Sequence, residues 1–129
     1  MSSVERLRKY VKEVAGRVKQ VYEVIFTDRD GVPIFKCTVD SSVEMASLPP
    51  FLTTQAVAVD QLAKIGVGNL KYVAFFYNQY QVVLIQYGVT HLTLIASAHA
   101  NTSRLLDLGK DLFPLIQKFQ SVAAHAANH

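Results

Sequence analysis

The sequence predicts an α+β fold, in which a five-stranded antiparallel sheet carries helices on both faces in the order α-β-β-α-β-β-β-α. Apolar residues recur at helical spacing in three segments, and β-rich runs lie between these segments. The connections between neighbouring β-rich runs are too short for a parallel crossover, so the strands must be antiparallel. A chain of 129 residues with 50% hydrophobic content can bury one sizeable core. We therefore expect one domain over residues 1–124 and a flexible C-terminal tail over residues 125–129.

A first helix is predicted to begin after a cap at Ser2 or Ser3. One side of it is apolar and the remainder is rich in basic residues. The apolar positions are Val4, Leu7, Val11, Val14, Ala15 and Val18, and the basic ones are Arg6, Arg8, Lys9, Lys12 and Arg17. We expect the apolar stripe to be buried and the basic face to be solvated; contact of that face with an acidic partner or anionic lipid is the alternative.

Two β-rich runs follow, Val21–Thr27 and Val32–Thr38. The connection Asp28-Arg29-Asp30-Gly31 is typical of a tight turn, because Gly tolerates the positive φ that such turns need. The two runs are therefore predicted to pair as an antiparallel hairpin, in which the Asp side chains accept hydrogen bonds from nearby backbone amides.

A second helix is predicted from Phe51 to Ile65, after Pro49 and Pro50. Its apolar residues occupy two faces instead of one. One face holds Leu52, Ala56, Val59 and Ala63, and the other holds Phe51, Thr54, Ala58, Leu62 and Ile65. The first face suits packing on the sheet, and the second is predicted to bury against another element or another chain.

Three strands and a helix complete the chain. The strands are predicted at Leu70–Tyr77, Tyr80–Tyr87 and Thr90–Ser97. The last of them is apolar on both sides, which is typical of a central strand, and the first is predicted at a sheet edge. Asn101 is predicted to cap a final helix that Gly109 and Pro114 bend or interrupt and that frays from Ala123 onward.

Composition narrows the class of protein. The net charge of +3 indicates a weakly basic protein, which does not favour nucleic-acid binding. The single Cys37 excludes an internal disulfide and suits a reducing compartment. The N-terminal segment has no continuous apolar run typical of a signal peptide, and no stretch approaches the roughly 20 apolar residues of a membrane span. A cytoplasmic location is expected, with membrane association only through partners.

The residues resemble the roadblock/LC7 family, and within it the MEK-binding scaffold subunits of the late-endosomal and lysosomal Ragulator complex. The similar stretches run over nearly the whole chain: Thr27-Asp-Arg-Asp-Gly-Val-Pro33, Phe51-Leu-Thr-Thr with Asp60-Gln61, Tyr77-Asn-Gln-Tyr-Gln-Val-Val83, and Leu94-Ile-Ala-Ser with Ala100-Asn-Thr102. Leu62-Ala63 and His99 depart from the family pattern.

The resemblance implies a non-catalytic scaffold that forms a heterodimer with a second roadblock subunit of Ragulator. It implies docking of the kinases MEK and ERK, support of Rag GTPases in recruiting the TORC1 kinase, and attachment to late endosomes and lysosomes through a lipidated anchoring subunit. No cofactor is implied. The implied heterodimer interface consists of Phe51, Thr54, Ala58, Gln61, Leu62, Ile65, Leu70, Lys71, Tyr72, Val73, Ala74, Phe75, Phe76 and Tyr77.

Two rival readings remain. Val24-Ile-Phe-Thr-Asp28-Arg-Asp30-Gly-Val32 resembles the haloacid-dehalogenase phosphatase signature, for which Ser97, Asp107, Lys110 and Asp111 could supply the other groups. That chemistry needs a parallel sheet, whereas short hairpins are predicted here. The second rival is a homodimeric roadblock protein that serves dynein or a small GTPase.

Other residue patterns do not indicate a metal or nucleotide site. His91 and His99 have no Cys, Asp or Glu beside them to complete a metal site, so structural roles are expected. The segment Gly66-Val-Gly68 lacks the Lys and hydroxyl residue of a phosphate-binding loop. We therefore predict no catalytic, cofactor or metal site.

Overall fold

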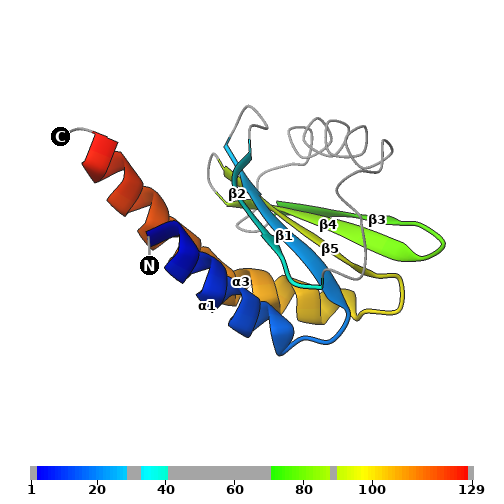
Figure 1. Ribbon diagram of the computed structural model, residues 1–129. Coiled ribbons are helices and arrows are strands. Elements are labelled where there is room, and N and C mark those ends of the chain that lie inside the picture. Colours follow the sequence, from blue (N-terminus) through cyan, green and yellow to red (C-terminus); the bar gives the residue numbers. More distant parts are fainter. Residues whose placement is uncertain (1–2, 29–32, 41–70, 88–89, 128–129) are drawn as a thin grey trace.

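The computed structural model describes residues 3–28, 33–40, 71–87 and 90–127. Its elements are α1 (Ser3–Gly16), β1 (Val21–Thr27), β2 (Pro33–Thr38), β3 (Lys71–Phe76), β4 (Tyr80–Tyr87), β5 (Thr90–Ser97) and α3 (Thr102–Ala127). Figure 1 shows the five strands as one twisted sheet with both of these helices beside it. The strand bounds agree with the sequence prediction to within one residue.

The sheet has the strand order β2-β1-β5-β4-β3, and every neighbouring pair is antiparallel. Strand β5 lies at the centre, and all eight of its residues are buried. Strand β3 lies at one edge and β2 at the other. The predictions of an antiparallel sheet, a central last strand and an edge position for the third strand are therefore confirmed.

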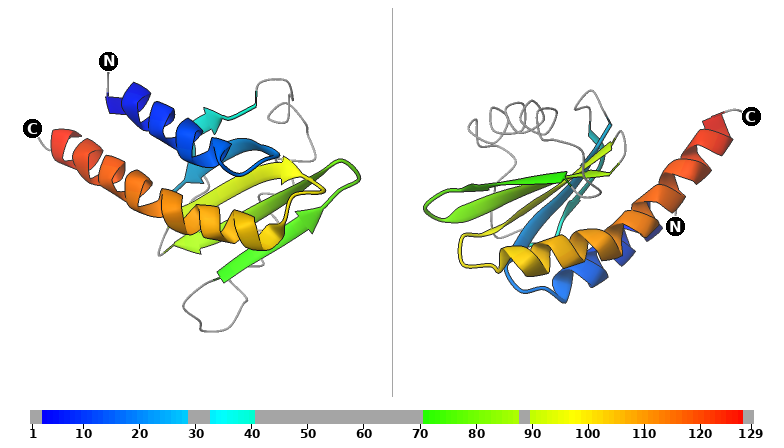
Figure 2. Two further views of the ribbon diagram at one scale, coloured as in Figure 1. Left: turned by 90° about the horizontal axis from the view of Figure 1, so that it is seen from below. Right: turned by 180° about the vertical axis from the view of Figure 1, so that it is seen from behind.

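Helices α1 and α3 lie side by side on one face of the sheet, with the start of α1 and the end of α3 toward the same end of the molecule (Figure 2). The apolar stripe of each helix packs into one core with the facing strand residues. From the helices this core takes Leu7, Val11, Ala15, Leu105, Leu108, Leu112 and Ile116, and from the central strands Val24, Phe26, Val83, Ile85, Leu92 and Leu94. Burial of each large side chain contributes about 1.5–3 kcal/mol to the free energy of unfolding.

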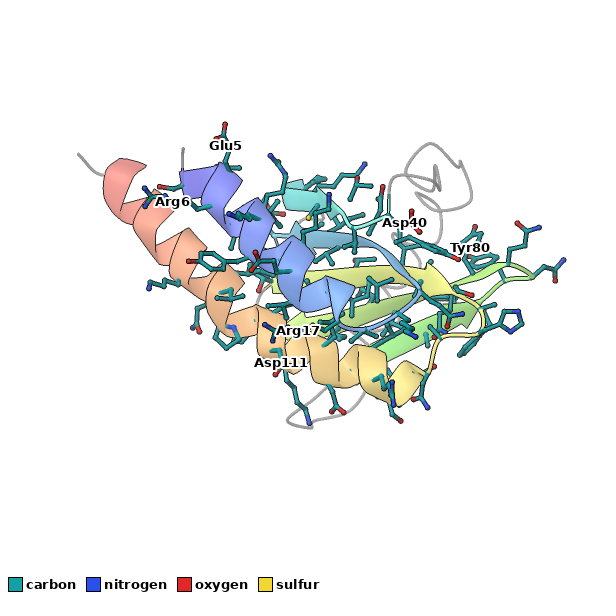
Figure 3. The ribbon with its side chains drawn as sticks, turned by 60° about the horizontal axis from the view of Figure 1, so that its bottom comes forward. Glu5, Arg6, Arg17, Asp40, Tyr80 and Asp111 are labelled. Carbon is teal, nitrogen blue, oxygen red and sulfur yellow. The ribbon has the colours of Figure 1, made fainter. Side chains whose placement is uncertain are left out.

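The outer side of this helical layer is polar. Arg6, Lys9, Lys12 and Arg17 are exposed, as predicted for the basic side of the first helix. Figure 3 shows Arg6 and Arg17 of this side and Asp111 of α3 among the side chains of the layer. Among the described residues, no helix is long and apolar enough to cross a membrane.

Helix α3 is not interrupted at Gly109 or Pro114, and it continues to Ala127, beyond the predicted fraying from Ala123. Pro114 removes one backbone donor, but buried Leu112 and Ile116 anchor the helix on both sides of it. Gly109 marks the point of closest approach to the sheet, since a Cβ there would lie 2.7 Å from Ile85 Cδ1 and 2.9 Å from Tyr87 Oη.

The second sheet face is also buried. Ile25, Val82 and Ile95 form a cluster there, against which Tyr22, Tyr77 and Tyr80 pack. The predicted second helix, Phe51–Ile65, lies outside the described residues. Helices on both faces of the sheet therefore stay a prediction, because α1 and α3 cover only one of them.

A buried glutamine joins β4, β5 and α3 at one end of the sheet. Gln81 is fully buried, and its Nε2 donates hydrogen bonds to the carbonyls of Ser97 (3.1 Å) and Ala100 (2.7 Å). Its Oε1 accepts one from the Thr102 hydroxyl (2.9 Å). The Asn101 side chain then caps α3 by accepting from the Arg104 amide (3.3 Å). The start of α3 is thus fixed relative to the sheet.

Candidate interaction edge

Among the described strands, β3 pairs with β4 alone and along one side, so its other side is a rim of backbone groups. The Tyr77 amide donates to the Tyr80 carbonyl (2.8 Å), which sets the alternation of bonded positions along this hairpin. In an antiparallel pair every second residue bonds to its partner strand. By this alternation, the amides and carbonyls of Tyr72, Ala74 and Phe76 face away from β4. They are the groups that an added strand would bond.

The opposite edge, β2, is less suited to strand addition. It begins with Pro33, which has no backbone donor, and carries the exposed charge of Lys36. The Lys36 carbonyl accepts a hydrogen bond from Arg8 Nε (3.4 Å), and the Arg8 guanidinium lies 5.9 Å from the centre of the Phe35 ring. Helix α1 thus reaches over β2, whereas α3 packs mainly on β4 and β5.

The side chains of β3 divide between the two faces of the sheet. Val73 and Phe75 pack against Leu84 on the face away from the helices. Tyr72, Ala74 and Phe76 stand opposite Ile85, Val83 and Gln81, on the same face as α3. Tyr72 is 43% exposed and Phe76 is 64% exposed. The edge strand therefore adds exposed aromatic side chains to its open backbone rim.

The structure places part of the predicted interface at this edge. Residues 71–76 form β3, and Tyr77 follows it, with its ring stacked on that of Tyr80 at 4.7 Å between centres. The predicted residues Phe51, Thr54, Ala58, Gln61, Leu62, Ile65 and Leu70 lie outside the described residues, so their interface role stays a prediction.

Two of the residues proposed for phosphatase chemistry, Asp28 and Ser97, do not come together. In the β1–β5 pair, Thr27 stands opposite His91 and Val21 opposite Ala96. Asp28 therefore lies at one end of the sheet and Ser97 at the other, separated by about 20 Å of strand. The Ser97 hydroxyl instead accepts a hydrogen bond from the His99 amide (3.1 Å). This arrangement and the antiparallel sheet argue against the phosphatase reading.

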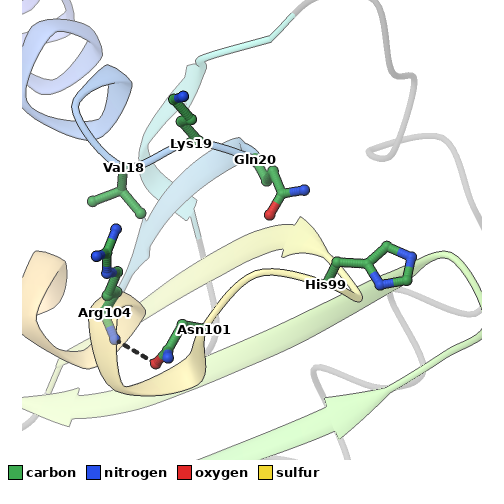
Figure 4. A pocket seen from close by; sticks show the side chains of 6 residues that line it. All are labelled: Val18, Lys19, Gln20, His99, Asn101 and Arg104. Atoms are coloured by element: carbon green, nitrogen blue, oxygen red, sulfur yellow. Dashed lines mark hydrogen bonds between the residues drawn. The ribbon is translucent and has the colours of Figure 1, made fainter.

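Two other candidate residues in the described ranges, His91 and Cys37, are buried within the fold. Burial lowers the pKa of His91 and raises the pKa of the Cys37 thiol, whose Sγ donates to the Arg8 carbonyl (3.6 Å). In the described part of the chain, no three His, Cys, Asp or Glu residues gather as a metal site. Figure 4 shows an open hollow lined by Val18, Lys19, Gln20, His99, Asn101 and Arg104. Its described lining holds cationic side chains, amides and one imidazole, and no carboxylate is among these residues.

The sequence prediction found the edge strand but missed two features of the structure. It did not distinguish the exposed side chains, Tyr72 and Phe76, from the packed ones, Val73 and Phe75. The signal available in the sequence was that side chains along Lys71–Phe76 alternate strictly between the two faces of the sheet. It also missed Gln81, because a single Gln among apolar strand residues gives no sign of three buried hydrogen bonds.

Comparison with known proteins identifies relatives of similar length. Residues 5–123 match the protein family described as "Mitogen-activated protein kinase kinase 1 interacting". The Ragulator complex protein LAMTOR3 of Danio rerio is 36% identical over 118 residues, which cover 92% of this chain and 95% of that protein. LAMTOR3 of Homo sapiens is 35% identical over 116 residues, 90% of this chain and 94% of that protein.

Solved structures agree on the fold. A structure titled "MglB with tetrameric arrangement" matches with a TM-score of 0.63 and 12% identity, covering 87% of this chain and 86% of that chain. A roadblock/LC7 domain from Streptomyces avermitilis matches with a TM-score of 0.55 and 13% identity, covering 87% and 92%. At such identities the likeness shows the roadblock/LC7-like fold alone.

Proposed function

Because the chain belongs to the mitogen-activated protein kinase kinase 1 interacting family, we propose that it is a non-catalytic scaffold subunit of a Ragulator-type complex. The observation that carries this proposal is the open rim of β3, which bears exposed aromatic side chains beside unshared backbone groups. An unpaired edge of this kind is a usual route by which one chain extends the sheet of another.

The proposed mate is a second roadblock subunit that presents its own corresponding edge. When two related sheets meet edge to edge about an approximate two-fold axis perpendicular to them, the adjoining strands run antiparallel. Tyr72, Ala74 and Phe76 of this chain would then bond the mate through their outward amides and carbonyls. The predicted second helices would pack against each other beneath the joint, through Phe51, Thr54, Ala58, Gln61, Leu62 and Ile65.

Further partners follow from the family and from its relatives. The family description names mitogen-activated protein kinase kinase 1 and the relatives are Ragulator proteins, so we propose that the heterodimer docks MEK and, with it, ERK. Support of Rag GTPases and of TORC1 recruitment is proposed through the same complex. A lipidated anchoring subunit would hold the complex on late endosomes and lysosomes.

The pairing is tested by co-purifying the full chain with the second Ragulator roadblock subunit and measuring the mass of the product by light scattering. Ala74→Pro removes the central outward amide of β3 and leaves the β3–β4 bonds intact. We expect it to abolish the heterodimer. Ala74→Val is the matched control, because it adds similar bulk but retains the amide; it should still pair. Pairing of the Pro variant at wild-type affinity would refute the strand-addition model.

The same measurement separates the alternatives. A stable homodimer that ignores the second subunit would favour the homodimeric roadblock class. Kinase docking is tested next, by titrating purified MEK into the heterodimer and into each subunit alone. We expect binding by the heterodimer; absence of binding would remove the kinase part of the proposal but leave the pairing intact.

A further inference from the structure

Positive charge is concentrated on the side of the molecule where the helices lie. Residues 3–20 hold six Lys and Arg against two Glu, and α3 holds three Lys and Arg against two Asp. These two segments, the helical layer, carry a net charge of +5, whereas the rest of the chain, with four Lys and Arg against six Asp and Glu, carries −2. The cations of the layer are Arg6, Arg8, Lys9, Lys12, Arg17, Lys19, Arg104, Lys110 and Lys118.

These cationic side chains are exposed, and the described chain engages only one of them. All nine are open to solvent. Arg8 is turned toward β2, where it meets the Lys36 carbonyl and the Phe35 ring. Within the described ranges, no hydrogen bond or ion pair engages the side chain of any of the other eight. The layer therefore presents an excess of positive charge, which an anionic partner complements.

The cations are spread over the layer instead of converging on one point. The two helices lie side by side (Figure 2). Helix α3 carries its cations over about 21 Å, from Arg104 to Lys118, and α1 carries them from Arg6 to Arg17, just beyond its end. A single phosphate or carboxylate contacts only a few adjacent donors. The spread therefore suits an extended anionic surface better than a small anion.

The described part of the layer also offers little of the apolar centre that a protein partner uses. Stable protein interfaces have a buried apolar or aromatic core surrounded by polar residues. Among the described residues of the two helices, the exposed large hydrophobic side chains are Val4 (38%) and Tyr10 (57%), both on α1. Tyr10 lines an open hollow with Arg6, Lys9 and Glu13. An aromatic ring with a polar tip beside long cationic side chains suits the level of lipid headgroups, so a charged bilayer is favoured over an acidic protein.

We propose that the helical layer contacts the anionic headgroups of a phospholipid bilayer directly. This goes beyond the proposed function, in which a lipidated partner subunit alone attaches the complex to the membrane. The opposite charges of the two parts of the chain fix its orientation, because a negative bilayer surface attracts the +5 layer and repels the −2 remainder. The rim of β3 belongs to the sheet and takes no part, so lipid contact and pairing are separate properties.

The test measures co-sedimentation of the full chain, without its mate, with phosphatidylcholine vesicles that contain or lack about 30% phosphatidylserine, at about 0.1 M and about 0.5 M salt. The variant Arg6→Gln with Lys9→Gln removes two cations from α1. The matched control, Asn78→Asp with Gln79→Glu, lowers the net charge by the same amount at exposed positions of the β3–β4 hairpin. Arg6→Lys with Lys9→Arg retains both charges. Circular dichroism first establishes that each variant is folded.

We expect the chain to bind only the vesicles that contain phosphatidylserine, and to bind them less at the higher salt concentration. Each cation removed should weaken binding about fivefold, so the double Gln variant should bind about 25-fold more weakly. The hairpin control should stay within about twofold of the wild type, because its added charges lie away from α1. The variant that retains both charges should bind as the wild type does.

The proposal is overturned if phosphatidylserine makes no difference, if the hairpin control loses as much affinity as the double Gln variant, or if the double Gln variant binds normally. Displacement of the chain from vesicles by an equal charge concentration of a soluble Glu-rich peptide would assign the layer to an acidic protein segment instead. Pairing with the second roadblock subunit is measured separately. Failure of vesicle binding therefore leaves the proposed function standing, and failure of pairing leaves the vesicle result intact.

Discussion

Replacing Gln81 with Leu should lower the free energy of unfolding by about 2–3 kcal/mol. The substitution retains the volume of this fully buried side chain but removes its three hydrogen bonds. A buried hydrogen bond contributes about 1 kcal/mol net, and a buried group left without its partner costs about 1–3 kcal/mol. These contributions fall unequally on the three partners of Gln81.

The Ser97 carbonyl retains the bond from the Ala100 amide (3.0 Å), and the half-buried Thr102 hydroxyl can turn to water. The cost therefore falls mainly on the Ala100 carbonyl, whose bond to Gln81 is the shortest of the three at 2.7 Å. Thr102→Val removes only one of the bonds and should cost about 0.5–1 kcal/mol. Because both changes remove the same bond, the double variant should be less destabilised than the two single losses together, by a similar amount.

Urea unfolding of the full chain at one fixed concentration, followed by circular dichroism, gives these differences from the midpoints. Gln79→Leu is the matched control, since Gln79 lies exposed in the same hairpin. A loss below about 0.5 kcal/mol for Gln81→Leu, or strict additivity with Thr102→Val, would show that these bonds do not fix α3 to the sheet.

Three further predictions concern single groups. Burial lowers the pKa of His91 below its usual 6.5, so His91 of the unfolded chain takes up a proton at a higher pH than His91 of the folded chain. The free energy of unfolding should therefore fall as the pH drops below about 6.5. His91→Gln should flatten this pH dependence, whereas His99→Gln, at an exposed position, should not. Burial raises the pKa of Cys37, so at pH 8 iodoacetamide should modify the folded chain at least about tenfold more slowly than the urea-unfolded chain, and equal rates would contradict the buried position. Asn101→Ala should cost about 1 kcal/mol in urea unfolding through loss of the α3 cap, and Asn101→Asp should retain most of the stability because its carboxylate accepts the same Arg104 amide.

The strands were predictable because the sequence itself marks both ends of each strand. Short connections fix the β4 and β5 hairpins, and the Leu92–Ala96 segment, apolar except for Thr93, requires a position buried on both faces. The alternative that Gly109 and Pro114 interrupt α3 was wrong. Pro114 and Gly109 have poor local propensity, but tertiary packing of Leu112 and Ile116 outweighs it.

The interaction edge was predictable in position but not in detail. That β3 lies at the edge follows from topology, whereas the exposure of Tyr72 and Phe76 depends on where α3 ends its cover over β4. A helix's lateral position on a sheet is set by side-chain packing, such as the stacking of Phe113 on Tyr87, and has no local sequence signal. The role of Gln81 is equally non-local, because its bonding partners lie 16 to 21 positions away.

The difference between the two sheet edges sets how many subunits can join. Strand β2 begins with proline and lies within reach of Arg8 from α1, so its rim is less suited to strand addition than the rim of β3. A sheet with two open rims can add neighbours indefinitely and grow into a fibre. A sheet that adds strands at the β3 rim alone joins one neighbour, and growth terminates as soon as that rim is occupied. Assembly beyond the pair must then use faces and helices in place of strands.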